Sequence, residues 1–225
     1  MPNEMAVGAS QRENAASWYR KFHTNDYFTL LHLPFASTLI SYAIIGSAMA
    51  PSISAARLAV ALVAVFFAHQ GSHYLDEIRG HPWNTKISNR TLYALGFIFL
   101  AIGIAAGVYL LITVSFMLIL FFIPMVFFPI AYSMELWRGL FHRPLSFGIS
   151  SALVCLGSYF LQSLSISLSS LLMSLAICIQ SVYIIILYEA TKADSTKFLS
   201  WNTLKGIIIL WIFIAASLLL LRTPW

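Results

Sequence analysis

The sequence predicts an all-α polytopic membrane protein, a bundle of about seven transmembrane helices with a cytoplasmic N-terminus. Of its 225 residues, 60% are hydrophobic and only 9% are charged, whereas soluble domains carry about 25% charged residues. The segments 91–134 and 144–188 contain no charged residue and no histidine. Because one membrane-spanning helix needs about 20 apolar residues, each segment fits two helices joined by a turn.

Two parts of the chain are expected. Residues 1–28 form a cytoplasmic N-terminal segment, in which aromatic and basic side chains from Ser17 onward are typical of a helix lying in the membrane interface. Residues 29–225 form a single transmembrane helical domain.

Seven spans are expected within that domain, two of them interrupted by proline. Pro34 lies early in the first span, where neighbouring groups can satisfy the carbonyl it frees, and Pro124 and Pro129 predict a kink in the fourth span. The expected spans are 29–49, 55–75, a pair within 91–134 that turns near Thr113, a pair within 144–188 that turns between residues 162 and 170, and 204–221.

The basic residues predict the orientation in the membrane. With the N-terminus inside, only Arg57 and Arg222 fall outside. Such a bias predicts that the polar loops face the cytoplasm of a prokaryotic cell. It also explains the net charge of +5, so no nucleic-acid partner is expected. The inner residues are Arg12, Arg20, Lys21, Arg79, Lys86, Arg90, Arg138, Arg143, Lys192, Lys197 and Lys205.

A dense polar stretch from His69 to Arg90 follows the second apolar run. If the helix continues at 3.6 residues per turn, four of its side chains project within about a third of the circumference. Ionisable groups at membrane depth usually face the bundle interior and mark a functional site. Carboxylates favour Mg²⁺, whereas two imidazoles favour zinc or iron. The four residues are His69, His73, Asp76 and Glu77.

The same stretch resembles the UbiA superfamily of intramembrane prenyltransferases. That family carries Asn-Asp-x-x-Asp-x-x-x-Asp after its second span, where this chain has His73 to His81. The segment from Thr85 to Leu92 is similar to the basic tail that follows, which ends Asn-Arg-Pro-Leu in the family. The family's second acidic motif, in the loop after the sixth span, corresponds to Tyr188-Glu189-Ala190-Thr191-Lys192-Ala193-Asp194.

The resemblance implies transfer of a polyprenyl group from its diphosphate to an acceptor at the cytoplasmic face. Lys86 and Arg90 would then neutralise the leaving group and act in catalysis together with Asp76 and Glu77. The expected partners are a membrane lipid or a prenyl diphosphate, and a second membrane protein or a second copy of the chain. The implied Mg²⁺ ligands are Asp76, Glu77, Glu189 and Asp194, and the implied substrate-binding residues are His69, His73, His81, Asn89 and Lys192.

Desolvation makes a geometric prediction for this site. The polar loops after the second and sixth spans should meet across one cavity, so that neighbouring cations or a metal can compensate the carboxylates. Asp76 or Glu77 should then lie within roughly 10 Å of Glu189 or Asp194, since metal–oxygen bonds are only ~2.0–2.6 Å long.

Two other functions fit the sequence. Tyr74, Glu77 and His81 stand where the family has its three aspartates, which is compatible with a non-catalytic membrane subunit or lipid-binding scaffold. Alternatively, His69 and His73 belong to a histidine-metal membrane enzyme of the hydroxylase or hydrolase kind. That site needs histidines from other helices, for which His32 and His142 are the available partners, although an interfacial or hydrogen-bonded role is the ordinary expectation for both.

Overall fold

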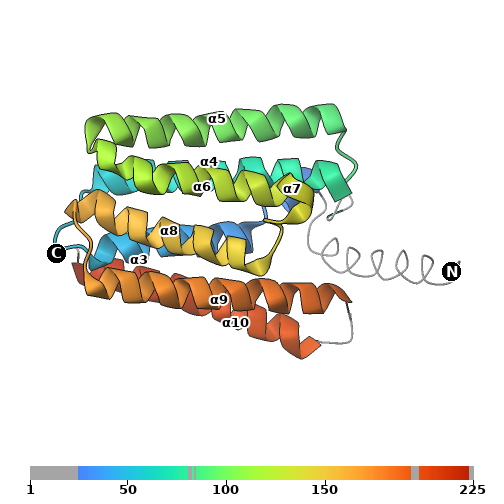
Figure 1. Cartoon of the computed structure of the whole chain (residues 1–225). Helices are drawn as coiled ribbons and strands as arrows, with labels where there is room; N and C mark the ends of the chain where they lie inside the picture. The colour runs from blue at the N-terminus through green and yellow to red at the C-terminus, as the bar shows by residue number, and fades with distance from the viewer. Residues whose placement is uncertain (1–24, 81–82, 84, 194–197, 223–225) are drawn as a thin grey trace, which may run out of the picture.

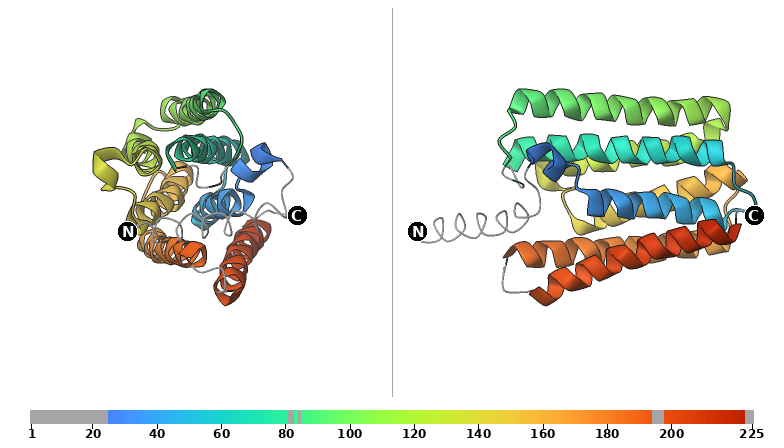
Figure 2. Two further views of the ribbon diagram at one scale, coloured as in Figure 1. Left: turned by 90° about the vertical axis from the view of Figure 1, so that its right-hand side faces the viewer. Right: turned by 180° about the vertical axis from the view of Figure 1, so that it is seen from behind.

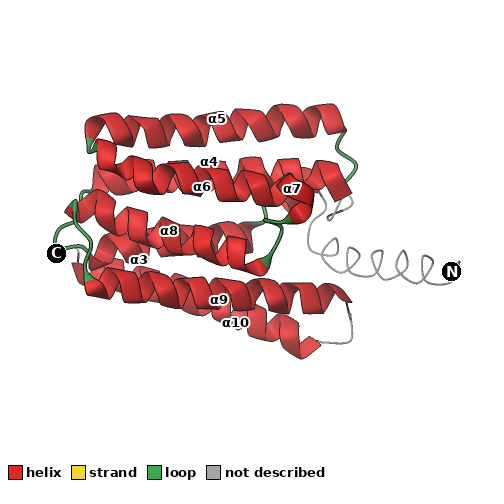
Figure 3. Cartoon of the chain, viewed as in Figure 1, coloured by secondary structure: helices red, strands yellow, loops and turns green. Residues whose placement is uncertain are grey.

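The computed structural model describes residues 25–80, 83, 85–193 and 198–222, and these form a bundle of long helices (Figure 1). Across the described residues every regular element is helical (Figure 3). The elements are α2 (Asp26–Leu30), α3 (Leu33–Met49), α4 (Ala55–Gly80), α5 (Asn89–Thr113), the 3-10 turn η1 (Phe116–Leu118), α6 (Ile119–Ser133), α7 (Leu136–Gly139), α8 (Pro144–Ser163), α9 (Leu168–Ala193) and α10 (Phe198–Arg222).

Seven segments are long and apolar enough to cross a membrane, which confirms the predicted fold class. The turns also lie where the sequence places them, after Thr113 and between Ser163 and Leu168. The seven segments are Asp26–Met49, Ala55–Ile78, Asn89–Thr113, Phe116–Ser133, Pro144–Ser163, Leu168–Tyr188 and Thr203–Leu221. The expected interfacial helix falls largely in residues 1–24, outside the described residues, and the cytoplasmic orientation stays a prediction.

The helices are arranged in layers, with α5 on one side and the α9–α10 pair on the other (Figures 1 and 2). Between them, α3 packs against α4, α8, α9 and α10, while α4 packs against α5, α6 and α8. We define the polar end of the bundle as the end where α4, α6 and α9 finish and α5, α8 and α10 begin. The loop carrying Trp83 and Thr85 lies at this end.

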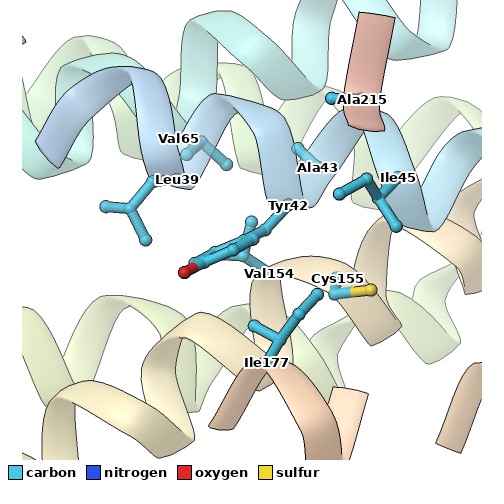
Figure 4. Packing of buried hydrophobic residues seen from close by; sticks show 9 residues of the cluster. All are labelled: Leu39, Tyr42, Ala43, Ile45, Val65, Val154, Cys155, Ile177 and Ala215. Carbon is cyan, nitrogen blue, oxygen red and sulfur yellow. The ribbon is translucent and has the colours of Figure 1, made fainter. Parts of the chain in front are cut away.

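The core of the bundle is built around Tyr42 of α3, whose side chain is fully buried (Figure 4). Its hydroxyl donates to Oε1 of Gln180 and accepts from Oγ of Ser181, both on α9. These bonds satisfy a buried phenol that would otherwise cost free energy in an apolar environment. The apolar side chains of this cluster come from five helices: Leu39, Tyr42, Ala43, Ile45, Val65, Val154, Cys155, Ile177 and Ala215.

Close approach of α3 to α8 depends on Gly46. A Cβ at Gly46 would clash with the backbone carbonyl oxygen of Cys155 on α8. Small residues at helix contacts let membrane helices pack closely, because dispersion attraction grows as the backbones approach.

Gly46→Ala should therefore lower stability by about 1–3 kcal/mol, the usual cost of overpacking, despite alanine's better helix propensity. Gly206→Ala is the matched control, because a Cβ there meets nothing within 4 Å. Thermal unfolding in detergent measures both variants. Equal melting temperatures for the two would contradict the packing role of Gly46.

Candidate metal centre

Three histidines meet at the polar end of the bundle. His69 and His73 lie one turn apart on α4, and His32 lies between α2 and α3. One ring nitrogen of each lies within 4.8 Å of those of the other two. Nδ1 of His32 and Nε2 of His73 are hydrogen-bonded at 3.0 Å, so one of them carries a proton there. The spacing His-x3-His thus presents two imidazoles to a third from the preceding helix.

A break in the first span places His32 in this group. Pro34 lacks an N–H, and its ring would clash with the carbonyl of Leu30 in a continuous helix. The chain therefore ends α2 at Leu30 and restarts α3 at Leu33, with His32 in the left-handed region at φ 42°. Gln70, fully buried on α4, donates its side-chain amide to the carbonyl oxygen of Leu31 at 2.7 Å. The first span, expected over residues 29–49, is therefore present but is interrupted at His32.

The imidazoles are shielded from water. His32 and His69 are 4% and 7% exposed. The ring of His32 stacks on Phe35, with centroids 4.4 Å apart, and lies equally close to the ring of Trp83. Nε2 of His69 is buried with no hydrogen-bond partner. An unsatisfied buried acceptor or donor costs about 1–3 kcal/mol, and coordination of a metal would remove that cost.

Glu77 anchors the loop that covers the cluster. Its carboxylate is fully buried and accepts from the backbone N–H of Trp83 at 3.0 Å and of Thr85 at 2.8 Å. The Thr85 hydroxyl donates to the same carboxylate at 2.9 Å. Asp26 of α2 holds the next part of this loop by accepting from the N–H of Lys86. Both oxygens of Glu77 therefore accept hydrogen bonds from the loop, and its expected catalytic and Mg²⁺-binding roles stay predictions.

A cavity of about 110 Å³ adjoins two of the three histidines. His69, Ser72, His73 and Asp76 line it from α4, and the rest of its lining comes mainly from α6 and α8, with Leu39 of α3 and Gly103 of α5. Since one water needs about 10–15 Å³ of such space, the cavity holds several small groups. Asp76 reaches the cavity but is not among the residues whose ligand atoms cluster within 4.8 Å.

The remaining predicted site residues are placed differently. Lys86, Asn89 and Arg90 are exposed, and none of them lines the cavity. Residues His81 and Asp194 lie outside the described residues. The side chains of Glu189 and Lys192, on the last turns of α9, are likewise outside them, so the expected distance between the two acidic motifs stays a prediction.

The end of α9 does reach the loop after α4. The rings of Trp83 and Tyr188 have centroids 5.9 Å apart, and Glu189 directly follows Tyr188 in the chain.

Of the two histidines considered as extra ligands, His142 is exposed and bonds the carbonyl oxygen of Tyr132. Of the two roles expected for His32, interfacial or hydrogen-bonded, the structure shows the second, because His32 is buried and bonds His73.

No protein-family model, curated protein or solved structure matches this chain. The chemistry of the site therefore follows from its own geometry. Three clustered imidazoles, two of them buried and two of them lining a cavity, can bind a transition metal and leave one coordination position facing the cavity.

Replacing Glu77 tests its role in the loop. Glu77→Gln puts an amide N–H where the carboxylate accepts backbone N–H groups, and should lower stability by about 1–3 kcal/mol. The same replacement at the exposed Glu135 is the control. Thermal unfolding and limited proteolysis of the loop would report the change, and a Glu77 variant as stable and as protease-resistant as the control would exclude this anchoring role.

Proposed function

We propose that this protein is a zinc-dependent hydrolase whose metal is held within the bundle by His32, His69 and His73. The observation that carries the proposal is the cluster of three imidazoles with ligand atoms within 4.8 Å, two of which border a cavity. In a tetrahedral site with zinc–nitrogen bonds of ~2.0–2.1 Å, ligand nitrogens lie about 3.3 Å apart. Small rotations of these rings reach that spacing.

The donor set favours zinc over the other metals considered. Mg²⁺ prefers oxygen ligands, and non-haem iron enzymes usually combine two histidines with one carboxylate. Here the clustered ligands are three nitrogens. Structural zinc sites are closed by four protein ligands, whereas three histidines and an open position are typical of catalytic zinc.

Asp76 is the group placed to move a proton. It lies one turn beyond His73 on α4 and lines the same cavity. Zinc held by the three histidines would supply an activated water, because such a metal lowers the pKa of bound water to about 7. Asp76 would accept the proton of the water that attacks the carbonyl carbon of the substrate, and would return that proton to the leaving group. One water is consumed, and one bond to the acyl carbon is broken.

Polyprenyl transfer is the second candidate, and one observation favours it. The contact between Trp83 and Tyr188 brings the start of the second acidic segment to the loop after α4. Transfer would require Mg²⁺ and a prenyl diphosphate, whereas hydrolysis at the histidines requires neither. Metal content and ligand choice therefore separate the two functions.

Metal content is the first test. The purified chain should contain one zinc per molecule, and His69→Ala and His73→Ala should lose it. His32→Asn should lose it too, because asparagine tolerates the left-handed backbone without supplying an imidazole. His142→Ala is the control and should keep the metal. Zinc retained in all three cluster variants, or binding of prenyl diphosphate that needs only Mg²⁺, would overturn the assignment.

Asp76→Asn tests catalysis separately from metal binding. We expect normal zinc content but hydrolysis of p-nitrophenyl octanoate reduced by about 10²–10⁴-fold, the usual contribution of a general base. Glu135→Gln should change neither quantity. Full activity in the Asp76 variant would remove Asp76 from the mechanism, and no hydrolysis by the wild-type protein would favour a scaffold.

A further inference from the structure

The cavity beside the histidines adjoins a second one that is almost entirely apolar. The second cavity has a volume of about 70 Å³. Both cavities are lined by Ala64, Val65, Phe122 and Met125, so they adjoin between α4 and α6. The second is otherwise lined by Ala61, Gly107, Leu110, Leu118, Phe121, Gly157, Ser158 and Leu161.

All three walls change from polar to apolar in the same direction. On α4, Asp76, His73 and His69 give way to Val65 and Ala61 on one helix face, at spacings of three and four residues. On α6, Tyr132 and Ser133 near the polar end give way to Phe122 and Phe121.

The wall formed by α8 runs antiparallel to α6 and shows the same change. Ser146 and Ser150 near its start give way to Val154, Gly157 and Leu161. We call the two adjoining cavities together the track. From His69 to Ala61 the track follows eight residues of α4, about 12 Å at 1.5 Å per residue.

The polar part of this track is poor in positive charge. Its described lining contains one carboxylate, Asp76, and no lysine or arginine. Phosphate and diphosphate groups are usually held by such cations. A polar group bound here therefore meets hydroxyls, imidazoles and the carboxylate of Asp76, which favours an uncharged group.

We infer that the substrate is a neutral amphiphile with a single hydrocarbon chain and an acyl linkage, whose chain lies along this track toward Ala61. Apolar cavities exclude water and accept apolar occupants, and the second cavity is small, with a volume of about 70 Å³. The position of the acyl group beside the histidines rests on the proposed function. The binding of the chain depends on the cavities alone.

Chain length is the property that tests this inference. The probes are N-octanoylethanolamine and N-palmitoylethanolamine, with binding to the purified full chain and zinc-dependent hydrolysis both measured. Ala61→Leu fills the far cavity and should weaken binding and hydrolysis of the palmitoyl probe by about tenfold or more. The octanoyl probe, whose chain does not need to reach Ala61, should be unaffected.

Two further variants test whether the effect of Ala61→Leu is specific to the second cavity. Ala59→Leu adds the same side chain at an exposed position of α4 and should change neither probe. Gly157→Ala narrows the same cavity from α8, since its Cβ would lie 3.2 Å from Cβ of Phe121, and should repeat the length-dependent loss if Ala61→Leu does not fold.

The outcomes separate this inference from the proposed hydrolysis. In one outcome the wild-type protein contains no zinc and hydrolyses neither probe, but binding still depends on chain length, also in the His73→Ala variant. That outcome would refute only the proposed function. In another outcome hydrolysis depends on zinc, but Ala61→Leu and Gly157→Ala affect both probes equally. That outcome would refute only the proposed binding of the hydrocarbon chain in the second cavity. Preference for dipalmitoylglycerol or farnesyl diphosphate over the palmitoyl probe would refute the neutral, single-chain assignment.

Discussion

The break of the first span at His32 is the constraint on which the candidate site depends. A continuous helix would carry residue 32 past α4, and no third imidazole would meet His69 and His73. Pro34 prevents that continuation, and the amide of Gln70 bonds the carbonyl of Leu31 at the break. The left-handed backbone of a non-glycine residue costs roughly 1–2 kcal/mol. Such strain persists only where surrounding contacts fix it, as the rings of Phe35 and Trp83 do here.

Two adjacent carboxylates on α4 have separate environments. Glu77 accepts three hydrogen bonds from N–H and hydroxyl donors of the loop, whereas Asp76 borders the cavity. Successive residues of a helix project about 100° apart, so neighbours in sequence face different surroundings. The helical projection that puts both on one broad face could not distinguish a structural carboxylate from one available for chemistry.

The fold was largely predictable from the sequence, because charge-free segments and turn residues fix membrane spans. The site was less so. His69 and His73 were recognisable from their spacing, since both lie on one helix, but His32 lies between α2 and α3 and its direction depends on its own left-handed backbone. Pro34, two residues later, was the available signal for a break. The exposed positions of Lys86 and Arg90 depend on how the loop is tied by Glu77 and Asp26, which no local pattern specifies.

The polarity of the cavity follows from the same helices that build the bundle. In α4, the residues that line the cavities change from alanine and valine to histidine and aspartate toward the polar end, so one helix supplies both an apolar wall and two of the three clustered imidazoles. His32 and His73 are bonded to each other, whereas Nε2 of His69 is buried without a hydrogen-bond partner, which has a cost that a ligand would relieve. A group held at the histidines would lie where the polar lining of the cavities meets the apolar lining. The proposed metal site and the proposed substrate class both depend on this one face of α4.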